Sequence, residues 1–131
     1  MHCLNLKITY ECTNNCSFCF SSYLKNNIMS IEGMKDAIKK GFNNGCNELV
    51  ISGGEPTNIP HAIMELMSLA EELGYKKYII QTNGSGLSEN NKLLCFLNSI
   101  AKDKEICISF SVHGSNCKIH DEMSRKSGAY N

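Results

Sequence analysis

The chain has 131 residues, a length that suits one hydrophobic core rather than two domains. Its 13 Lys and Arg residues balance its 13 Asp and Glu residues, so charge gives no reason to expect binding to nucleic acid or to an anionic membrane. The start MHCLNLKITY lacks the features of a secretory signal, and no apolar run reaches the ~18 residues of a membrane span. We therefore expect a soluble, cytoplasmic protein.

The first half of the chain alternates between strand and helix patterns. Residues 4–10 (LNLKITY) predict a strand. A helix is predicted at 30–45, where apolar residues recur at helical spacing between Ser30 as N-cap and Gly45 as the stop. Residues 47–52 (NELVIS) predict a short apolar strand that runs into the sequence GGEP.

The second half continues the alternation. A helix is predicted at 60–74, because it begins with a proline, ends with a glycine and carries one apolar face. A strand at 77–82, a helix at 88–102 and a strand at 105–112 follow. Strands separated by helices of this length predict an α/β fold with right-handed βαβ units and a parallel sheet, either open or forming part of a barrel.

Polar and apolar residues alternate along three of the predicted strands, although a parallel strand covered on both faces would be apolar throughout. The apolar face of the last strand comprises Ile106, Ile108, Phe110 and Val112. Its polar face comprises Cys107, Ser109, Ser111 and His113. Matching polar positions in the first and third strands are Asn5, Lys7, Thr9, Gln81 and Asn83. We expect the apolar face to lie under the helices and the polar face to line a cavity.

The sequence holds eight cysteines. A disulfide scaffold would require an export signal and a loop-rich chain, so we expect reduced thiols. Five of the cysteines are scattered through apolar segments and are expected to be small core residues: Cys3, Cys46, Cys95, Cys107 and Cys117.

The other three cysteines lie together in ECTNNCSFCF, directly after the first strand, and are Cys12, Cys16 and Cys19. Their loop should therefore lie at the carboxyl edge of the sheet, where parallel α/β folds bind ligands. Thiolates select zinc, copper(I) or iron–sulfur clusters, and a structural zinc site needs four protein ligands. A four-iron cluster held by three cysteines leaves one iron open to another ligand, which points to catalysis.

This pattern resembles the radical S-adenosylmethionine superfamily, whose motif has the spacing C-x3-C-x2-C with an aromatic residue before the last cysteine. Residues 53–56 (GGEP) resemble a second family motif, and residues 82–84 (TNG) and the SVHG that ends the last strand follow in the family's order. The resemblance covers nearly the entire chain. It implies a single core domain over residues 1–131, with a partial TIM-like barrel of about four of the family's six βα units.

The resemblance also implies the chemistry. Cys12, Cys16 and Cys19 would hold a 4Fe-4S cluster whose open iron binds S-adenosylmethionine. An electron from a donor such as flavodoxin or ferredoxin would cleave the cofactor to a 5′-deoxyadenosyl radical, which abstracts a hydrogen from the substrate. The chain would thus belong to an oxidoreductase.

The residues that would contact the cofactor are Phe18, Gly53, Gly54, Glu55, Asn83, Ser109 and Ser111. Glu55, with the backbone of the two glycines, would meet the methionine amino group, because glycine lets the backbone approach closely. Phe18 would lie beside the adenine, and Ser111 with either Asn83 or Ser109 would reach the ribose.

Four residues near the end of the chain are open to a structural or a functional interpretation. His113 suits a hydrogen-bonded structural histidine as well as a substrate contact. His120 and Asp121 lie in HDEMSR, which is similar to a stretch common after the fourth strand of the superfamily, and we expect a local capping role. Arg125, the only arginine, is expected in solvent rather than paired with the cofactor carboxylate.

The sequence departs from the family because it predicts four strands where the family core has six, and the last predicted strand would leave an open edge. A fragment, a partner-dependent protein and a remnant are all compatible with this. The SVHG and HDEMSR segments look most like members that modify peptides or proteins. The alternative function is a non-catalytic iron–sulfur or zinc-binding module.

Overall fold

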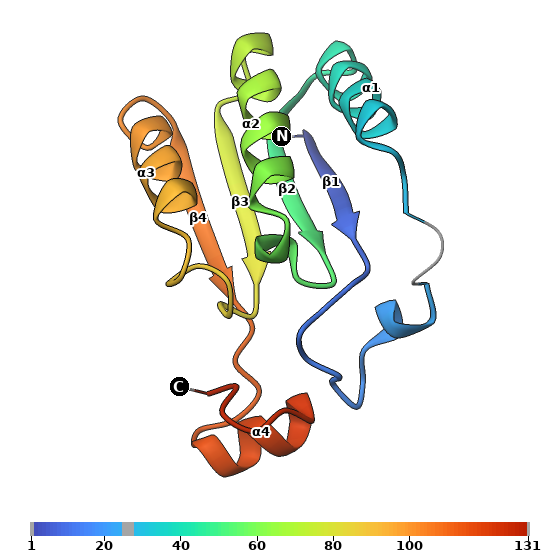
Figure 1. The fold of residues 1–131 in the computed structure, drawn as a ribbon. Coiled ribbons are helices and arrows are strands. Elements are labelled where there is room, and N and C mark those ends of the chain that lie inside the picture. The colour runs from blue at the N-terminus through green and yellow to red at the C-terminus, as the bar shows by residue number, and fades with distance from the viewer. Residues whose placement is uncertain (1, 25–27, 131) are drawn as a thin grey trace.

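The computed structural model describes residues 2–24 and 28–130 and shows one open sheet of four parallel strands in the order β1-β2-β3-β4 (Figure 1). The strands are β1 (His2–Thr9), β2 (Cys46–Gly53), β3 (Lys77–Thr82) and β4 (Glu105–Phe110). The helices between them are α1 (Ile31–Asn43), α2 (Pro60–Leu73) and α3 (Asn91–Ile100). The predicted α/β fold of alternating βα units is confirmed.

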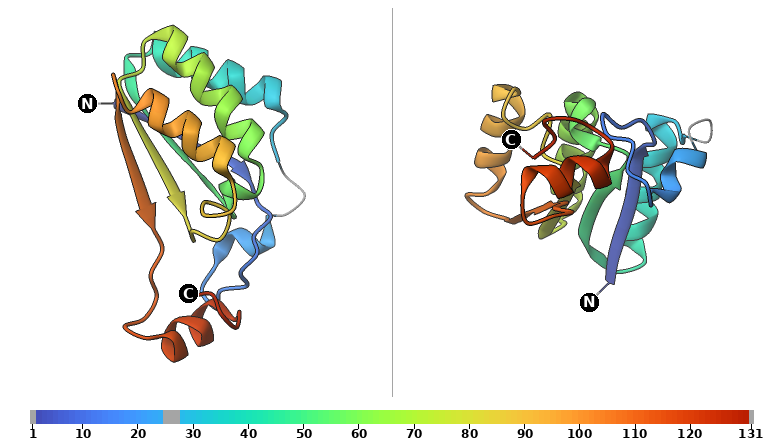
Figure 2. Two further views of the ribbon diagram at one scale, coloured as in Figure 1. Left: turned by 60° about the vertical axis from the view of Figure 1, so that its left-hand side comes forward. Right: turned by 90° about the horizontal axis from the view of Figure 1, so that it is seen from below.

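All three connecting helices cover the same face of the sheet, and the opposite face is left uncovered by them (Figure 2). A short helix, α4 (Cys117–Ser124), lies beyond the carboxyl ends of the strands. Two 3-10 turns, η1 (Phe20–Tyr23) and η2 (Pro56–Asn58), follow the cysteines and the GGE segment. Within the described residues, no helix combines the length and the apolar character needed to cross a membrane.

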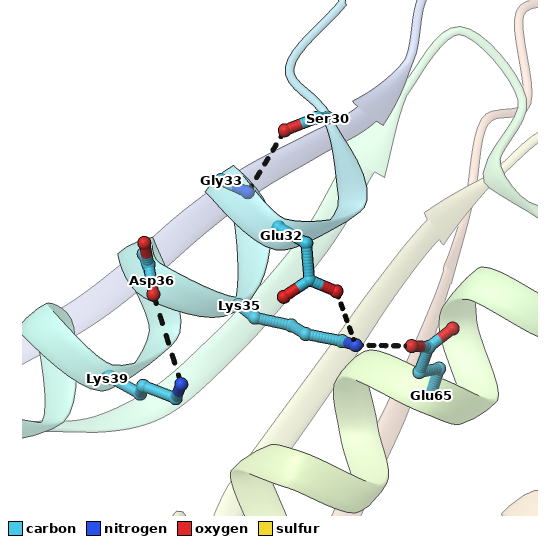
Figure 3. Close-up of polar contacts among 7 residues, drawn as sticks. All are labelled: Ser30, Glu32, Gly33, Lys35, Asp36, Lys39 and Glu65. Atoms are coloured by element: carbon cyan, nitrogen blue, oxygen red, sulfur yellow. Dashed lines mark hydrogen bonds and ion pairs between the residues drawn. The ribbon is translucent and has the colours of Figure 1, made fainter.

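The helix ends follow the predicted chemistry. The Ser30 hydroxyl accepts a hydrogen bond from the backbone N–H of Gly33 at 3.2 Å, which caps α1. Lys35 of α1 contacts Glu32 at 2.9 Å and reaches across to Glu65 of α2 at 2.6 Å (Figure 3). These contacts link α1 to α2 at the surface. At the end of α2, Gly74 adopts the left-handed conformation with φ of 106°.

The hydrophobic core lies between the sheet and the three helices. The strands contribute Leu6, Ile8, Leu49, Ile51, Tyr78 and Ile80, all buried. The helices contribute Met34, Ile38, Ile63, Leu66, Met67 and Leu93, also buried. The predicted apolar face is thus confirmed for the first and third strands, and its burial is the main force that holds the helices on the sheet.

Two predictions about buried residues were wrong. Phe110 and Val112 are 57% and 66% exposed, because Val112 lies beyond the end of β4 and the described helices leave this end of the strand uncovered. None of the five scattered cysteines is a buried core residue. Cys46 is half-buried and packs against the core, whereas Cys3, Cys95, Cys107 and Cys117 are exposed. Apolar neighbours in sequence therefore did not tell which way each thiol points.

Two helices differ from the predictions: one is shorter than predicted, and the other was not predicted. The helix predicted at 88–102 is shorter, because the Asn90 side chain accepts from the backbone N–H of Leu93 at 3.0 Å and so sets the start of α3. Helix α4 was not predicted, since its 8 residues are too few to show a clear apolar period. Its start is set by Asn116, whose side chain accepts from the backbone N–H of Ile119.

Candidate functional site

The polar face of the sheet and the cysteine loop enclose a cavity of about 340 Å³ at the carboxyl ends of the strands. The predicted site residues on its wall are Cys12, Cys16, Phe18, Cys19, Gly53, Gly54, Asn83 and Ser111. Two predicted residues lie off the wall: Glu55 is buried behind it, and Ser109 is exposed on β4. The cavity therefore collects residues from the cysteine loop and from the ends of three strands.

The two glycines after β2 permit a close approach of the cysteine loop. The backbone N–H of Gly54 donates to the Thr9 carbonyl, and that of Glu55 donates to the Glu11 carbonyl, each at 2.7 Å. A Cβ atom on Gly53 would lie 2.1 Å from the Thr9 carbonyl oxygen, and one on Gly54 would lie 2.2 Å from the Glu11 carbonyl oxygen. Gly53 also has φ of 140°, which side chains rarely adopt. Only glycine fits at these positions, because the chain's own backbone fills the space.

Glu55 joins the ends of β2, η2 and β3. Its side chain is fully buried, and one carboxylate oxygen accepts from the Thr57 backbone N–H at 3.0 Å and from the hydroxyls of Thr57 and Thr82. The other oxygen accepts from the backbone N–H of Asn83 at 2.6 Å. Among the described residues, no cationic side chain lies within ion-pair distance of Glu55. A buried carboxylate thus lies directly behind the cavity wall with neutral donors only.

The residues after β3 bind the cysteine loop through side chains. The Asn83 amide nitrogen lies 3.5 Å from the Cys12 sulfur and 3.3 Å from the Thr13 hydroxyl oxygen. The hydroxyls of Thr13 and Ser85 are 2.9 Å apart, and the backbone N–H of Asn14 donates to the Cys12 sulfur at 3.4 Å. The Asn83 amide is therefore engaged with the cysteine loop.

The thiols are affected by burial and by one another. Burial is the main cause of a raised pKa for Cys12, with contributions from the charges of Glu55 and Cys19, while hydrogen bonds from Asn14 and Asn83 act in the opposite direction. Burial also raises the pKa of Cys16, followed by the charges of Cys12 and Cys19. In the described part of the chain, no three His, Cys, Asp or Glu side chains form a group that could hold a single metal ion. In a cluster, by contrast, each thiolate binds a different iron atom.

Helix α4 holds the other side of the cysteine loop. The carbonyl of Ser124 accepts from the backbone N–H of Asn15 at 3.0 Å, and the carbonyl of Met123 accepts from that of Ser17 at 3.1 Å. Carbonyl groups in the last turn of a helix have no partner within the helix, so the loop satisfies them. The end of α4 and the cysteine loop, far apart in sequence, are thereby joined.

A line of rings reinforces this contact. The ring of His113 lies edge-on to Phe18, with centroids 4.9 Å apart, and stacks on His120 at 5.4 Å. His120 is 4% exposed, and its Nδ1 accepts from the His113 backbone N–H at 3.1 Å. Asp121 accepts from the backbone N–H groups of Gly128 and Tyr130 at 2.6 and 3.1 Å. His120 and Asp121 therefore both accept hydrogen bonds from nearby backbone N–H groups, in keeping with the local capping role expected for them.

Several outcomes concern single residues. Arg125 is exposed, so the expected position in solvent is confirmed. It ends α4 with φ of 50°. Thr9, expected on the cavity wall, is buried, and its hydroxyl accepts from the backbone N–H of Glu11. Lys7 lines the cavity, and the strand alternation had marked it as polar without assigning it a role. Phe20 also lines the cavity, and the sequence carried no signal for it.

The profile of the Radical SAM superfamily matches residues 6–130, so the chain belongs to this superfamily. The resemblance inferred from the motifs is therefore confirmed. The chain is 31% identical over 83 residues to the probable GTP 3′,8-cyclase of Saccharolobus islandicus strains M.14.25 and M.16.27, a match that covers 62% of this chain and 27% of each relative.

Solved structures give the same result over more of the chain. The crystal structure of Streptococcus suis SuiB matches with a TM-score of 0.74 and 25% identity over 95% of this chain. SuiB bound to S-adenosylmethionine matches with a TM-score of 0.73 and 26% identity. The chain spans 27% and 28% of these two SuiB chains, so it corresponds to about a quarter of each relative's length.

Proposed function

We propose that the chain binds a 4Fe-4S cluster through Cys12, Cys16 and Cys19 and takes part in the reductive cleavage of S-adenosylmethionine. The observation that carries this proposal is the gathering of all three thiols and of the paired glycines on one cavity at the carboxyl edge of a radical SAM fold. When bound, the cluster and the cofactor supply a 5′-deoxyadenosyl radical for hydrogen abstraction.

The residues present fit these two groups. Three thiols are soft ligands suited to iron–sulfur clusters, and three are one fewer than the usual four, which leaves a place for the cofactor. The buried carboxylate of Glu55 has no cationic partner among the described residues, and a buried charge is costly without one. An ammonium group bound beside Gly53 and Gly54 would offset that charge.

The other side chains would orient the cofactor and keep water away. Ser111 lines the cavity and is the better placed serine for the ribose, since Ser109 lies off the wall. Phe18 lies on the wall, with 54% of its surface exposed and free to cover an adenine ring. Asn83 would act mainly by holding the cysteine loop, because its amide contacts Cys12 and Thr13.

We further propose that the substrate is a peptide or protein and that flavodoxin or ferredoxin supplies the electron. The peptide substrate is supported by the SVHG and HDEMSR segments, which look most like those of family members that modify peptides or proteins. The electron donor is supported by the need of reductive cleavage for an external electron. The thiols must stay reduced for the cluster to form, which suits a reducing compartment such as the cytoplasm.

Replacement of single cysteines tests the proposal. The anaerobically reconstituted chain is expected to bind about four irons, and Cys12→Ala, Cys16→Ala or Cys19→Ala is expected to abolish this binding. Cys95→Ala on the surface of α3 and Cys46→Ala serve as matched controls that retain the iron. Iron and acid-labile sulfide are measured on each purified protein. Stoichiometric tetrahedral zinc without iron uptake would instead indicate a zinc-binding module.

A further inference from the structure

A row of polar side chains crosses the sheet on the cavity side, deeper than the cysteine loop. Lys7 of β1 pairs in register with Ser52 of β2, and Gln81 of β3 pairs with Ser109 of β4. Lys7, Ser52 and Gln81 all line the cavity. Lys7 comes two residues before Thr9, whose carbonyl accepts a hydrogen bond from Gly54. Two residues span roughly 6 to 7 Å along a strand. The backbone of this row therefore lies one to two residues nearer the amino ends of the strands than Thr9 and Gly53.

Lys7 supplies the cavity wall with a positive charge that no Asp or Glu on the wall pairs with. Among the described residues that line the cavity, Lys7 is the one Lys or Arg, and none is Asp or Glu. Its ammonium nitrogen lies 4.0 Å from the ring centroid of Phe20 and makes no hydrogen bond or ion pair with the described residues. The face of the Phe20 ring attracts the ammonium charge, but it is no strong hydrogen-bond acceptor for the three N–H groups of the ammonium.

Two other partly buried lysines of this chain each form ion pairs with two carboxylates. Lys35 contacts both Glu32 and Glu65, and Lys77 contacts Glu105 at 2.8 Å and Glu48 at 3.9 Å. Lys7 is half-buried as well, yet it has an aromatic ring in place of two carboxylates. Its donors are therefore available to a ligand.

A neighbouring amide adds to these donors. The Ser52 hydroxyl donates to the side-chain oxygen of Asn5 at 2.8 Å, so the Asn5 amide oxygen is engaged and its NH₂ group remains available. Asn5 lies two residues from Lys7 on the same face of β1 and lines the same cavity. An ammonium and an amide NH₂ group side by side form a site for an oxyanion.

We propose that Lys7, assisted by Asn5, binds a carboxylate of the substrate and so selects an acidic peptide. The assignment rests on the proposed function, because it places the substrate in the cavity that would also hold the cofactor. The methionine carboxylate of the cofactor has the same chemistry. The backbone of Lys7 lies two residues back from the strand end, but its ammonium lies over the ring of Phe20, next to Cys19, so the test below includes S-adenosylmethionine affinity.

Two labelled peptides test the assignment. The probes are fluorescein–Gly-Gly-Glu-Gly-Gly-amide and its counterpart with Gln in place of Glu, so that one carboxylate is the difference between the two peptides. Binding to the full chain is measured by fluorescence polarisation, with and without reconstituted iron. Wild-type protein is expected to prefer the Glu peptide by about 10-fold or more, the usual effect of a hydrogen bond to a charged group.

Substitutions then locate the preference. Lys7→Met is expected to abolish the preference for Glu, Lys7→Arg to keep it, and Lys77→Met, at the opposite end of the strands, to leave it unchanged. S-adenosylmethionine affinity of the iron-loaded protein should change less than about twofold in Lys7→Met, well below the loss of a charge-assisted bond.

The outcomes separate the two proposals. Wild-type protein that takes up no iron contradicts the proposed function, and the peptide preference is still measured on the iron-free chain. Equal binding of the two peptides by wild-type protein overturns the Lys7 assignment. A large loss of S-adenosylmethionine affinity in Lys7→Met would assign Lys7 to the cofactor carboxylate instead. Lys7-dependent binding of GTP without any peptide binding would overturn the acidic peptide as the substrate class.

Discussion

The two ends of the sheet use charge in opposite ways. At the amino ends of the strands, Lys77 lies in register between Glu48 and Glu105 and contacts both of them near the surface. At the carboxyl ends, Glu55 is fully buried and accepts hydrogen bonds from hydroxyl and backbone donors without a cation. The first arrangement is complete in itself, whereas the second leaves a negative charge beside a cavity.

This difference suggests a structural role for the charges at the amino ends of the strands and a ligand-binding role for Glu55 at the carboxyl ends. Ion pairs at a protein surface contribute little, because water screens them and the side chains lose freedom. A buried carboxylate without a cation is costly, so its presence beside three thiols and two glycines suggests that a bound ligand supplies the positive charge. Binding of such a ligand would then stabilise the folded state.

The largest effect is expected from Gly54→Ala. The new Cβ would lie 2.2 Å from the Glu11 carbonyl oxygen, so the cysteine loop must move away from β2. We expect a loss of about 3 kcal/mol in unfolding free energy, measured by urea denaturation, together with impaired iron binding.

Gly45→Ala is the matched control for this prediction. Gly45, unlike Gly54, has a positive φ of 86°, and a Cβ there meets no atom within 4 Å. The strained backbone alone should cost about 1 kcal/mol and leave iron binding intact. Equal losses in the two variants would show that the close approach of Gly54 to the cysteine loop does not matter.

An intermediate effect is expected from Glu55→Gln. The amide NH₂ group would face either the Asn83 backbone N–H or the threonine donors, so at least one buried hydrogen bond is lost. We expect the unfolding free energy to fall by about 1 to 3 kcal/mol. If the carboxylate also meets the cofactor's ammonium group, S-adenosylmethionine binding should weaken by about 1 to 3 kcal/mol while the iron content stays the same.

Glu105→Gln provides the comparison at the other end of the sheet, because Glu105 is mostly exposed in its contact with Lys77. This variant should bind the cofactor as the wild type does. Unchanged cofactor affinity in Glu55→Gln would limit Glu55 to a structural role.

The smallest effect is expected from Lys77→Met. The substitution removes both contacts at the amino ends of the strands but keeps the apolar stem of the side chain, so the thermal midpoint should shift by no more than about 3 °C. Differential scanning fluorimetry measures this shift. A much larger loss would mean that the amino end depends on its ion pairs, and the contrast between the two ends would not hold.

Much of this arrangement could be predicted from the sequence. The alternation along the first and third strands predicted an apolar face under the helices, and Leu6, Ile8 and Ile80 on that face are buried in the core. The motifs placed the cysteines and glycines at one edge of the sheet, because the carboxyl ends of parallel strands meet there. The burial of Glu55 was not predictable, since it depends on threonines from two different segments that meet only in the fold.

Other features were missed for similar reasons. The contact between α4 and the cysteine loop joins Asn15 to Ser124, and no local pattern relates residues so far apart. The exposure of Cys107 followed from its place on the uncovered face of β4, although its apolar neighbours suggested a core position. In each case the missing information was the position of a second segment rather than the preference of the first.

The most direct test of a cluster with one open iron is electron paramagnetic resonance of the anaerobically reconstituted and reduced chain, recorded with and without S-adenosylmethionine. We expect the signal of a reduced 4Fe-4S cluster, and its g values should change when S-adenosylmethionine is added, because one iron has no cysteine ligand and can bind the cofactor. A cluster signal that S-adenosylmethionine leaves unchanged, or a protein that holds tetrahedral zinc and no cluster, would contradict the proposed site.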